Sequence, residues 1–262
     1  MTVDYQYENG IACLHLNRPH RLNAVVPELT EALIDGLRRA GGDGAAVVVV
    51  AGRGRAFCAG HDLREPTPEE DPLGTRARVD RLQDVTREIR RFPGPVIAAV
   101  HGYALGAGCE FALACDLVVA AEDASFGFPE VGVGLSVTGG ISRLLPLAVG
   151  PMRAKEALML GDRLDAETAS GLGLVNRVVP AGTHEAAARE LAERLRERPR
   201  TALTLAKRVL DSGMDHTLEQ AMSVELDHAV TTRFTSESDV GRQEFERRRA
   251  DTGSDPGRVR HE

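Results

Sequence analysis

The sequence predicts an α/β protein with a parallel β-sheet at its core. Short apolar runs rich in β-branched residues recur at 45–52, 95–102 and 116–121, as expected for strands that are buried on both faces. Helical segments are expected between them, and an alternation of strand and helix is typical of a parallel sheet. After about residue 135 the pattern becomes almost entirely helical.

At the N-terminus we expect two strands joined by a tight turn at Asn9-Gly10, because this pair accepts the positive φ of hairpin turns. A helix should follow from about Pro27 to Arg39. The later segments comprise one short strand candidate at 174–180 and helices at 139–149, 152–160, 166–171, 183–199 and onward to about 249.

Two regions are expected, a catalytic core over 1–200 and a helical region over 201–262, with Pro199 at the boundary because proline disfavours helix continuation. The chain has 262 residues, of which 42% are hydrophobic, so it can bury a large core. Its net charge of −7 argues against general attraction to nucleic acid or anionic lipid.

The cysteines and the absence of targeting signals indicate the cellular compartment that we expect for the protein. The four cysteines form no C-x-x-C pair, which argues against a zinc site or a disulfide framework. Neither a signal peptide nor a long apolar span is apparent, so we expect a cytoplasmic protein.

The sequence does not match several common nucleotide-binding and catalytic motifs. The segment "GYALGAGCEF" departs from the dinucleotide-binding pattern G-x-G-x-x-G at Phe111, and no phosphate-binding P-loop pattern occurs. "GLSVTGG" departs from the hydrolase pattern G-x-S-x-G at Thr138. Cys109, with His101 nearby in sequence, suggests a thiol nucleophile, but a small buried cysteine is the commoner outcome.

Two loops remain as candidates for a binding site, "RAFCAGHDL" at 55–63 and "HGYALGAGCE" at 101–110. Each follows a predicted strand, and ligands of open α/β sheets gather at the carboxyl ends of strands. If a helix begins at 106–108, its first N–H groups lack partners and suit a developing oxyanion. The alternative is that the small residues only allow close packing of helix and sheet.

Two carboxylates, Glu110 and Glu130, lie in apolar surroundings with no partner apparent in the sequence. Burying such groups is costly. Either both side chains reach solvent at the ends of their elements, or a cavity holds them for chemistry.

Successive segments of the chain resemble the signatures of the crotonase family, the enoyl-CoA hydratases and isomerases. The similarity runs in order from about Ile11 to Phe245. The segments that carry it are "NRPHRLNAV", "GRAFCAGHDL", "HGYALGAGCEFALACDLVVA", "FGFPEVGVGL" and "LGLVNRVV".

This resemblance implies a crotonase-like spiral of ββα units with a C-terminal helical trimerisation region, and homotrimers that often pair into hexamers. It implies acyl-CoA thioester substrates, as in fatty acid metabolism. No metal or redox cofactor is implied, since coenzyme A is part of the substrate.

The resemblance also implies roles for individual residues. The N–H groups of His61 and Ala107 match the oxyanion hole, although the family usually has glycine at the second position. Glu110 and Glu130 match the two catalytic glutamates of the hydratases. In that role Glu110 deprotonates the water that attacks C3, and Glu130 exchanges a proton at C2.

The remaining matched positions belong to segments that bind coenzyme A. Arg21 is placed like a basic residue near the phosphates. The residues that match the adenine and pantetheine segments are Ala24, Ala59, Gly60, Asp62 and Leu63.

One segment departs from the family pattern. Hydratases commonly carry a loop like G-x-x-P-x-x-G-G after the second glutamate, whereas this chain reads "GVGLSVTGGISRLL". Ser136 and Thr138 therefore bring hydroxyls to this loop. They either bind a polar acyl group or cap the helix expected from about Gly139.

The sequence favours an enoyl-CoA hydratase. An isomerase or a 3-hydroxyacyl-CoA dehydratase of the same family would use the same oxyanion hole. A non-catalytic acyl-CoA-binding subunit is a further alternative, but a binder has little use for two carboxylates beside an anionic ligand.

Overall fold

The computed structural model describes residues 1–65 and 69–252, apart from the side chains of 240, 244, 245 and 248–252 near its end. It contains two compact units, Met1–Glu197 and Arg198–Glu262. The first unit is built on a six-stranded sheet in the order β1-β2-β3-β4-β6-β9. These strands are β1 (Val3–Glu8), β2 (Ile11–Leu16), β3 (Val47–Gly52), β4 (Val96–Val100), β6 (Leu117–Ala121) and β9 (Arg177–Val179).

The strand pairing follows the sequence pattern. β1 and β2 form the expected antiparallel hairpin, with positive φ at Asn9 (51°) and Gly10 (77°). Every other neighbouring pair in this sheet is parallel. The prediction of a parallel core is therefore confirmed.

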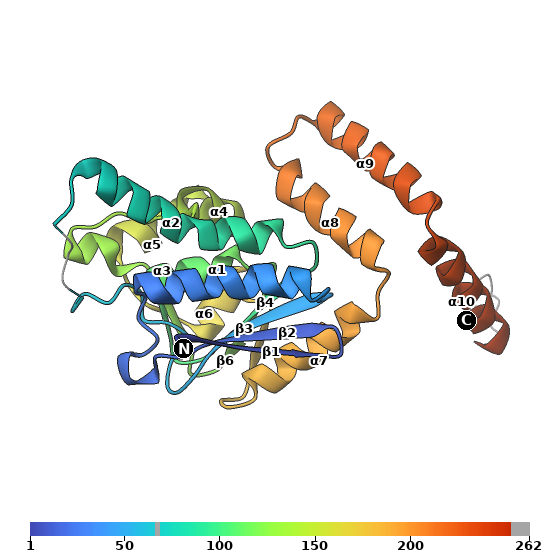
Figure 1. Ribbon diagram of the computed structural model, residues 1–262. Coiled ribbons are helices and arrows are strands. Elements are labelled where there is room, and N and C mark those ends of the chain that lie inside the picture. Colours follow the sequence, from blue (N-terminus) through green and yellow to red (C-terminus); the bar gives the residue numbers. More distant parts are fainter. Residues whose placement is uncertain (66–68, 253–262) are drawn as a thin grey trace, which may run out of the picture. The chain divides into compact units, whose positions relative to one another are not determined.

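Both faces of the sheet are covered, which explains why its strands are apolar on both sides. On β3, Val48 and Val50 join one apolar cluster with helices α1 (Pro27–Gly42) and α2 (Pro72–Arg91). The alternate residues Val47 and Val49 pack with α7 (His184–Arg196) in a second cluster. Figure 1 shows α1 and α2 side by side, with α7 on the other side of the sheet.

A second sheet of three short strands completes the first unit. Each long strand β4 and β6 is followed by a short strand of this sheet and then by a helix, which gives the ββα repeat of a crotonase-like fold. The sequence analysis missed these strands because each has only two or three residues. They are β5 (Tyr103–Leu105), β7 (Ser125–Gly127) and β8 (Leu164–Asp165).

The helices in the second half of this unit agree with the prediction. Their starts differ from the predicted ones by up to two residues, and α7 ends at Arg196 instead of at 199. The α-helices are α3 (Ala107–Ala114), α4 (Ile141–Val149), α5 (Pro151–Leu160) and α6 (Ala166–Gly171). Two short 3₁₀ helices are η1 (Pro19–Arg21) and η2 (Pro129–Val133).

The loop after β2 is fixed by a buried asparagine. Asn23 accepts a hydrogen bond from the backbone N–H of Arg18 (2.8 Å), and its amide donates to the carbonyls of Arg53 (2.9 Å) and Ala56 (2.7 Å). Because Asn23 is fully buried, these bonds tie the loop firmly to the segment after β3. That segment leads directly to the candidate site.

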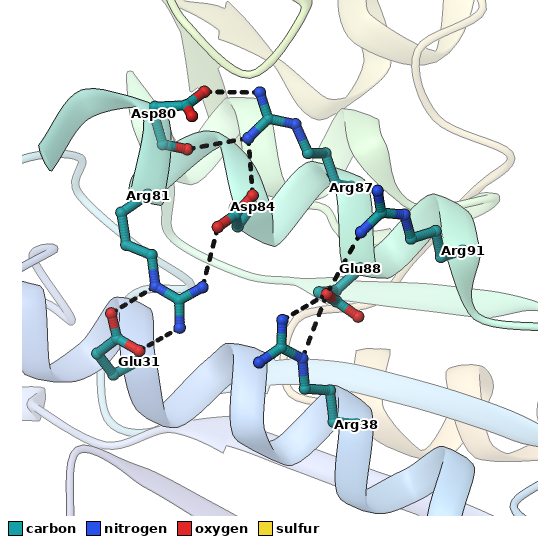
Figure 2. A network of polar contacts seen from close by, with 8 residues as sticks. All are labelled: Glu31, Arg38, Asp80, Arg81, Asp84, Arg87, Glu88 and Arg91. Atoms are coloured by element: carbon teal, nitrogen blue, oxygen red, sulfur yellow. Dashed lines mark hydrogen bonds and ion pairs between the residues drawn. The ribbon is translucent and has the colours of Figure 1, made fainter. Parts of the chain in front are cut away.

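Ion pairs hold α2 against α1 (Figure 2). Arg81 of α2 binds Glu31 of α1 through two hydrogen bonds and also reaches Asp84, while Arg38 of α1 binds Glu88 of α2 at 2.8 Å. Single exposed pairs contribute little, about 0.2–1 kcal/mol each. These pairs add to the apolar contact that the buried Leu82, Val85 and Ile89 of α2 make in the same cluster as α1. Helix α2 forms one wall of the cavity described below.

The second unit consists of helices only: α8 (Arg200–Gly213), α9 (Leu218–Arg233) and α10 (Ser236–Thr252). The carboxylate of Glu237 accepts hydrogen bonds from the first N–H groups of α8, at Arg200 (3.2 Å) and Thr201 (3.0 Å). Within the described ranges, no helix combines the length and the apolar character that crossing a membrane requires.

Candidate functional site

A cavity of about 610 Å³ opens in the first unit and contains both glutamates. Its walls come from α1, α2, the loop after β3, the start of α3, η2 and the loop before α4. Glu110, Glu130, His61 and Ala107 all line it. The structure therefore brings together the four residues that the family resemblance assigns to chemistry.

The segments that follow β3 and β4 are hydrogen-bonded to each other through their backbones. Cys58 donates to the carbonyl of Tyr103 (2.8 Å), and Leu105 donates back to the carbonyl of Cys58 (3.0 Å). A Cβ at Gly108 would lie 2.2 Å from the Cys58 carbonyl oxygen, so only glycine fits there. Close packing, one of the two explanations for the small residues, thus accounts for Gly108.

The other explanation, that free N–H groups in this segment suit an oxyanion, concerns the neighbouring residues. α3 begins at Ala107, so its N–H lies at the first position of the helix, where no intrahelical acceptor exists. Across the described chain, the N–H of Ala107 and the N–H of His61 have no acceptor within hydrogen-bond distance. Both residues border the cavity, so a carbonyl oxygen of a bound ligand can accept from this pair.

Glu110 is almost completely buried, with 1% of its surface exposed. Its Oε1 accepts from the N–H of Thr138 and its Oε2 accepts from the Thr138 hydroxyl, both at 2.6 Å. Burial raises the pKa of the Glu110 carboxyl, and the two hydrogen bonds from Thr138 oppose that rise. The carboxylate thus has two donors that stabilise its charge.

Glu130 lies in the first turn of η2 and is held differently. Its Oε2 is buried, and no hydrogen-bond partner is present among the described residues. Burial raises the pKa of Glu130, a hydrogen bond from its own backbone N–H opposes that rise, and the negative charge of Glu110 raises the pKa further. The protonated form of Glu130 is therefore favoured relative to an ordinary glutamate. The pKa of Glu110 is raised as well, so the two carboxyls differ in their hydrogen-bond partners rather than in the direction of the pKa shift.

The structure corrects the capping prediction for Thr138. Helix α4 begins at Ile141 after Gly140, and no side chain caps it. Instead of capping the helix, the Thr138 hydroxyl donates to Glu110. Ser136 and Thr138 both line the cavity, as the other alternative required.

The residues matched to the coenzyme A segments divide into two groups. Asp62 and Leu63 line the cavity, and Leu63 is 68% exposed. The carboxylate of Asp62 is held by the Arg18 guanidinium through two contacts of 3.1 Å. The residues that lie outside the cavity lining are Arg21, Ala24, Ala59 and Gly60.

The backbone of that outer group nevertheless belongs to the same loop system. Ala59 donates to the carbonyl of Leu22 (3.0 Å), and Val25 donates to the carbonyl of Gly60 (2.8 Å). The segments 21–25 and 59–63 are thus hydrogen-bonded to each other, and Val25, His61, Asp62 and Leu63 of these segments line the cavity. Arg21, in η1, is half-buried.

The sequence analysis missed the wall formed by α2. Val79 and Leu82 supply apolar surface to the cavity, while Arg78 supplies charge and is paired with Glu70 at 2.6 Å. A helical segment was expected between the strands at 45–52 and 95–102, and the spacing of Leu82, Val85 and Ile89 could have given its position. No signal in the sequence placed it at the site.

The thiol alternative is not supported by the geometry. Cys109 is fully buried, and burial raises the pKa of its thiol, so it stays protonated. His101 stacks on His184 with ring centroids 4.4 Å apart, and its Nε2 lies 3.0 Å from the Gly54 carbonyl oxygen. Within the described chain, no cluster of three histidine, cysteine or acidic side chains could hold a metal ion.

Comparison with known proteins gives the family. The model of the enoyl-CoA hydratase/isomerase family matches residues 6–254. The chain therefore belongs to this family, the crotonases, and the family resemblance is confirmed.

Individual relatives differ in the reaction that their names state. A crotonyl-CoA hydratase from Syntrophomonas wolfei is 35% identical over 84% of this chain and 85% of its own length. A 1,2-epoxyphenylacetyl-CoA isomerase from Escherichia coli is 36% identical over 84% of this chain and 86% of its own. A crystal structure of an enoyl-CoA hydratase from Polaromonas sp. JS666 superposes with a TM-score of 0.90 at 36% identity, covering 94% and 97% of the two chains.

Proposed function

We propose that this protein is an enoyl-CoA hydratase, which adds water reversibly to the α,β double bond of an enoyl-CoA thioester. The observation that carries the proposal is the pair of glutamates, Glu110 and Glu130, in one cavity with two N–H groups that lack acceptors. A reaction that moves two protons while charge develops on a carbonyl oxygen needs this combination.

In the proposed mechanism the N–H groups of His61 and Ala107 bind the thioester oxygen. As water attacks C3, electrons move through the double bond to this oxygen, which becomes an enolate. Preorganised donors at about 2.7–3.1 Å stabilise such a charge, and the loss of one donor typically lowers kcat by about 10²–10³-fold.

The glutamates take the two proton transfers. Glu110, with two donors on its carboxylate, accepts a proton from the attacking water. Glu130, whose surroundings favour its protonated form, delivers a proton to C2 as the enolate collapses. Exchange with water between turnovers restores both groups. General acid and base catalysis of this kind contributes about 10²–10⁴-fold.

Coenzyme A is proposed to bind along the loop system of segments 21–25 and 59–63. In this arrangement Arg21 meets the phosphates, while Ala24, Ala59, Gly60, Asp62 and Leu63 form the surface for adenine and pantetheine. Coenzyme A enters as part of the substrate, and the mechanism requires no metal or redox cofactor.

We also propose a homotrimer, or a hexamer of two trimers. The helices of the second unit expose large apolar side chains that a soluble chain normally covers. Light scattering at micromolar concentration should therefore give a multiple of three chains, and a monomer would contradict this. Location in the cytoplasm stays a prediction. The exposed residues are Leu210, Met214, Leu218, Met222, Leu226, Val230 and Phe234.

Other reactions of the family define the alternatives. An isomerase would use the same oxyanion hole to move a double bond, and one of the relatives is named as an isomerase. A 3-hydroxyacyl-CoA dehydratase would run the same chemistry mainly in reverse. A non-catalytic binding subunit would keep the costly buried carboxylate of Glu110, and the half-buried one of Glu130, without using them.

A panel of enoyl-CoA thioesters separates these candidates. Hydration should remove the conjugated absorbance and yield a 3-hydroxyacyl-CoA identified by mass. Double-bond migration without gain of water would assign an isomerase instead. Tight binding of coenzyme A esters without turnover across the panel would favour the binding subunit.

A further inference from the structure

Within the described part of the chain, Thr138 makes both of the hydrogen bonds that the Glu110 carboxylate receives. Its backbone N–H meets Oε1 and its hydroxyl meets Oε2, each at 2.6 Å. One residue therefore fixes both oxygens and with them the plane of the carboxylate. Distances this short are typical of hydrogen bonds to an ionised acceptor.

The backbone around Thr138 holds it in this position. Its carbonyl accepts a hydrogen bond from Ile141 (3.0 Å) at the start of α4. Gly139, with φ of 59°, follows it and lies directly over Glu110, since a Cβ there would be 3.0 Å from Oε2. The turn that precedes α4 thus holds the backbone N–H and the hydroxyl of Thr138 against the Glu110 carboxylate.

We propose that Thr138 is a positioning residue for the general base: its two donors fix the orientation of the Glu110 carboxylate toward the attacking water and favour its ionised form. This inference rests on the proposed hydratase function. It assigns Thr138 a role in proton transfer rather than in helix capping or in binding of the acyl group.

Elementary electrostatics explains why such a residue is needed. With 1% of its surface exposed, Glu110 has almost no water to stabilise its charge, and burial raises the pKa of its carboxyl. The two donors of Thr138 act in the opposite direction. The other titratable and charged groups that line the cavity with Glu110 are Glu28 and Glu31 of α1, Arg78 and Arg81 of α2, Glu130 of η2, and His61, Asp62 and Glu65 of the segment after β3.

The test replaces the hydroxyl while retaining the N–H. Thr138→Val keeps the branched shape, so it removes only the contact to Oε2. We expect kcat to fall by about tenfold, because a hydrogen bond to a charged group is lost, while KM changes little. The acidic limb of the kcat/KM profile should move to higher pH, since the ionised base is less stable. Thr138→Ser should restore both properties.

A matched control is available on α2. Thr86 is also buried and lies beside Gly139, with a Cβ at Gly139 predicted 3.3 Å from its Oγ1, but its hydroxyl has no partner within the part of the chain that is described. Thr86→Val should therefore leave kcat and the pH profile unchanged. If Thr138→Val does not fold, Thr138→Ala removes the same hydroxyl with a smaller side chain.

A direct titration makes this proposal separable from the hydratase assignment. The carboxyl of Glu110, labelled with carbon-13 and assigned by comparison with Glu110→Gln, should titrate at higher pH in Thr138→Val than in the wild type. An unchanged titration and an unchanged pH profile would overturn the role of Thr138 even in an active hydratase. If the titration shifts but the protein never adds water, the contact between Thr138 and Glu110 is supported. The hydratase assignment, and with it the role of Thr138 in activating water, is then rejected.

Discussion

Glu110 and Glu130 line the same cavity, but the chain holds them in different ways. Glu110 is fixed by two hydrogen bonds from one residue and has almost no exposed surface. Glu130 has a buried oxygen without a partner in the described structure, and its pKa is raised by burial and by the other carboxylate. The proposed assignment of Glu110 as base and Glu130 as acid rests on this difference in hydrogen-bond partners.

The largest effects are expected from removing either carboxyl. Glu110→Gln and Glu130→Gln keep the shape of the side chain but abolish its proton transfer, so each should lower kcat by about 10²-fold or more. Affinity for the coenzyme A ester should change little. Steady-state kinetics with the best substrate of the panel measures this. Near wild-type hydration in either variant would rule out a mechanism with two glutamates.

A second pair of changes acts through glycines that lie against the two carboxylates. A Cβ at Gly139 would be 3.0 Å from Oε2 of Glu110, and a Cβ at Gly106 would be 2.8 Å from Oε1 of Glu130. Both glycines also have positive φ, 59° and 51°. Alanine at either site should therefore reduce kcat and lower the free energy of unfolding by about 1–2 kcal/mol.

Gly132→Ala provides the control for this pair. Gly132 lies in η2, two residues from Glu130, but its Cβ would meet no atom within 4 Å. Kinetics and urea denaturation should therefore give wild-type values for it. If Gly132→Ala proved as harmful as the other two, the packing of glycine on each carboxylate would not explain the losses.

The parts of this site that depend on local sequence features could be predicted, and those that depend on contacts between distant residues could not. The buried strands and the loops after them were predictable because apolar runs and small residues are local features, and the order of family motifs indicated Glu110 and Glu130. The hydrogen bonds of Thr138 were not predictable. They join residues 28 positions apart, and a hydroxyl before a helix is more often a cap.

The wall formed by α2 was missed for a related reason. Its sequence carries many charges, which indicate a solvated helix. In the structure its buried residues Leu82, Val85 and Ile89 pack in the core, and its ion pairs with α1 add to this contact (Figure 2). The three short strands escaped because two or three residues carry too little periodicity. Contacts between distant segments thus account for most of what the sequence analysis missed.

A smaller effect concerns stability. Burial raises the folded-state pKa of Glu130, so the wild type loses stability relative to Glu130→Gln as pH rises through that pKa. We expect the variant to gain about 1 kcal/mol near neutral pH, the lower range for an unsatisfied buried group. The gain should vanish below the unfolded-state pKa of about 4.3, where both states are protonated.

Glu110→Gln sharpens this comparison. Its carboxylate is already stabilised by Thr138, so the variant should gain less than Glu130→Gln at neutral pH. Urea denaturation of both variants at several pH values and one protein concentration measures the difference. Equal gains, or gains independent of pH, would mean that the two surroundings do not differ as described.

Deuterium exchange at C2 of a saturated acyl-CoA in D₂O tests the division of roles most directly, because it needs proton transfer at C2 but no water attack at C3. If Glu130 serves C2 and Glu110 serves the water, Glu110→Gln should retain measurable exchange although its hydration is lost. Glu130→Gln should lose both. Exchange at the wild-type rate in Glu130→Gln, or its complete loss only in Glu110→Gln, would contradict the assignment of acid and base.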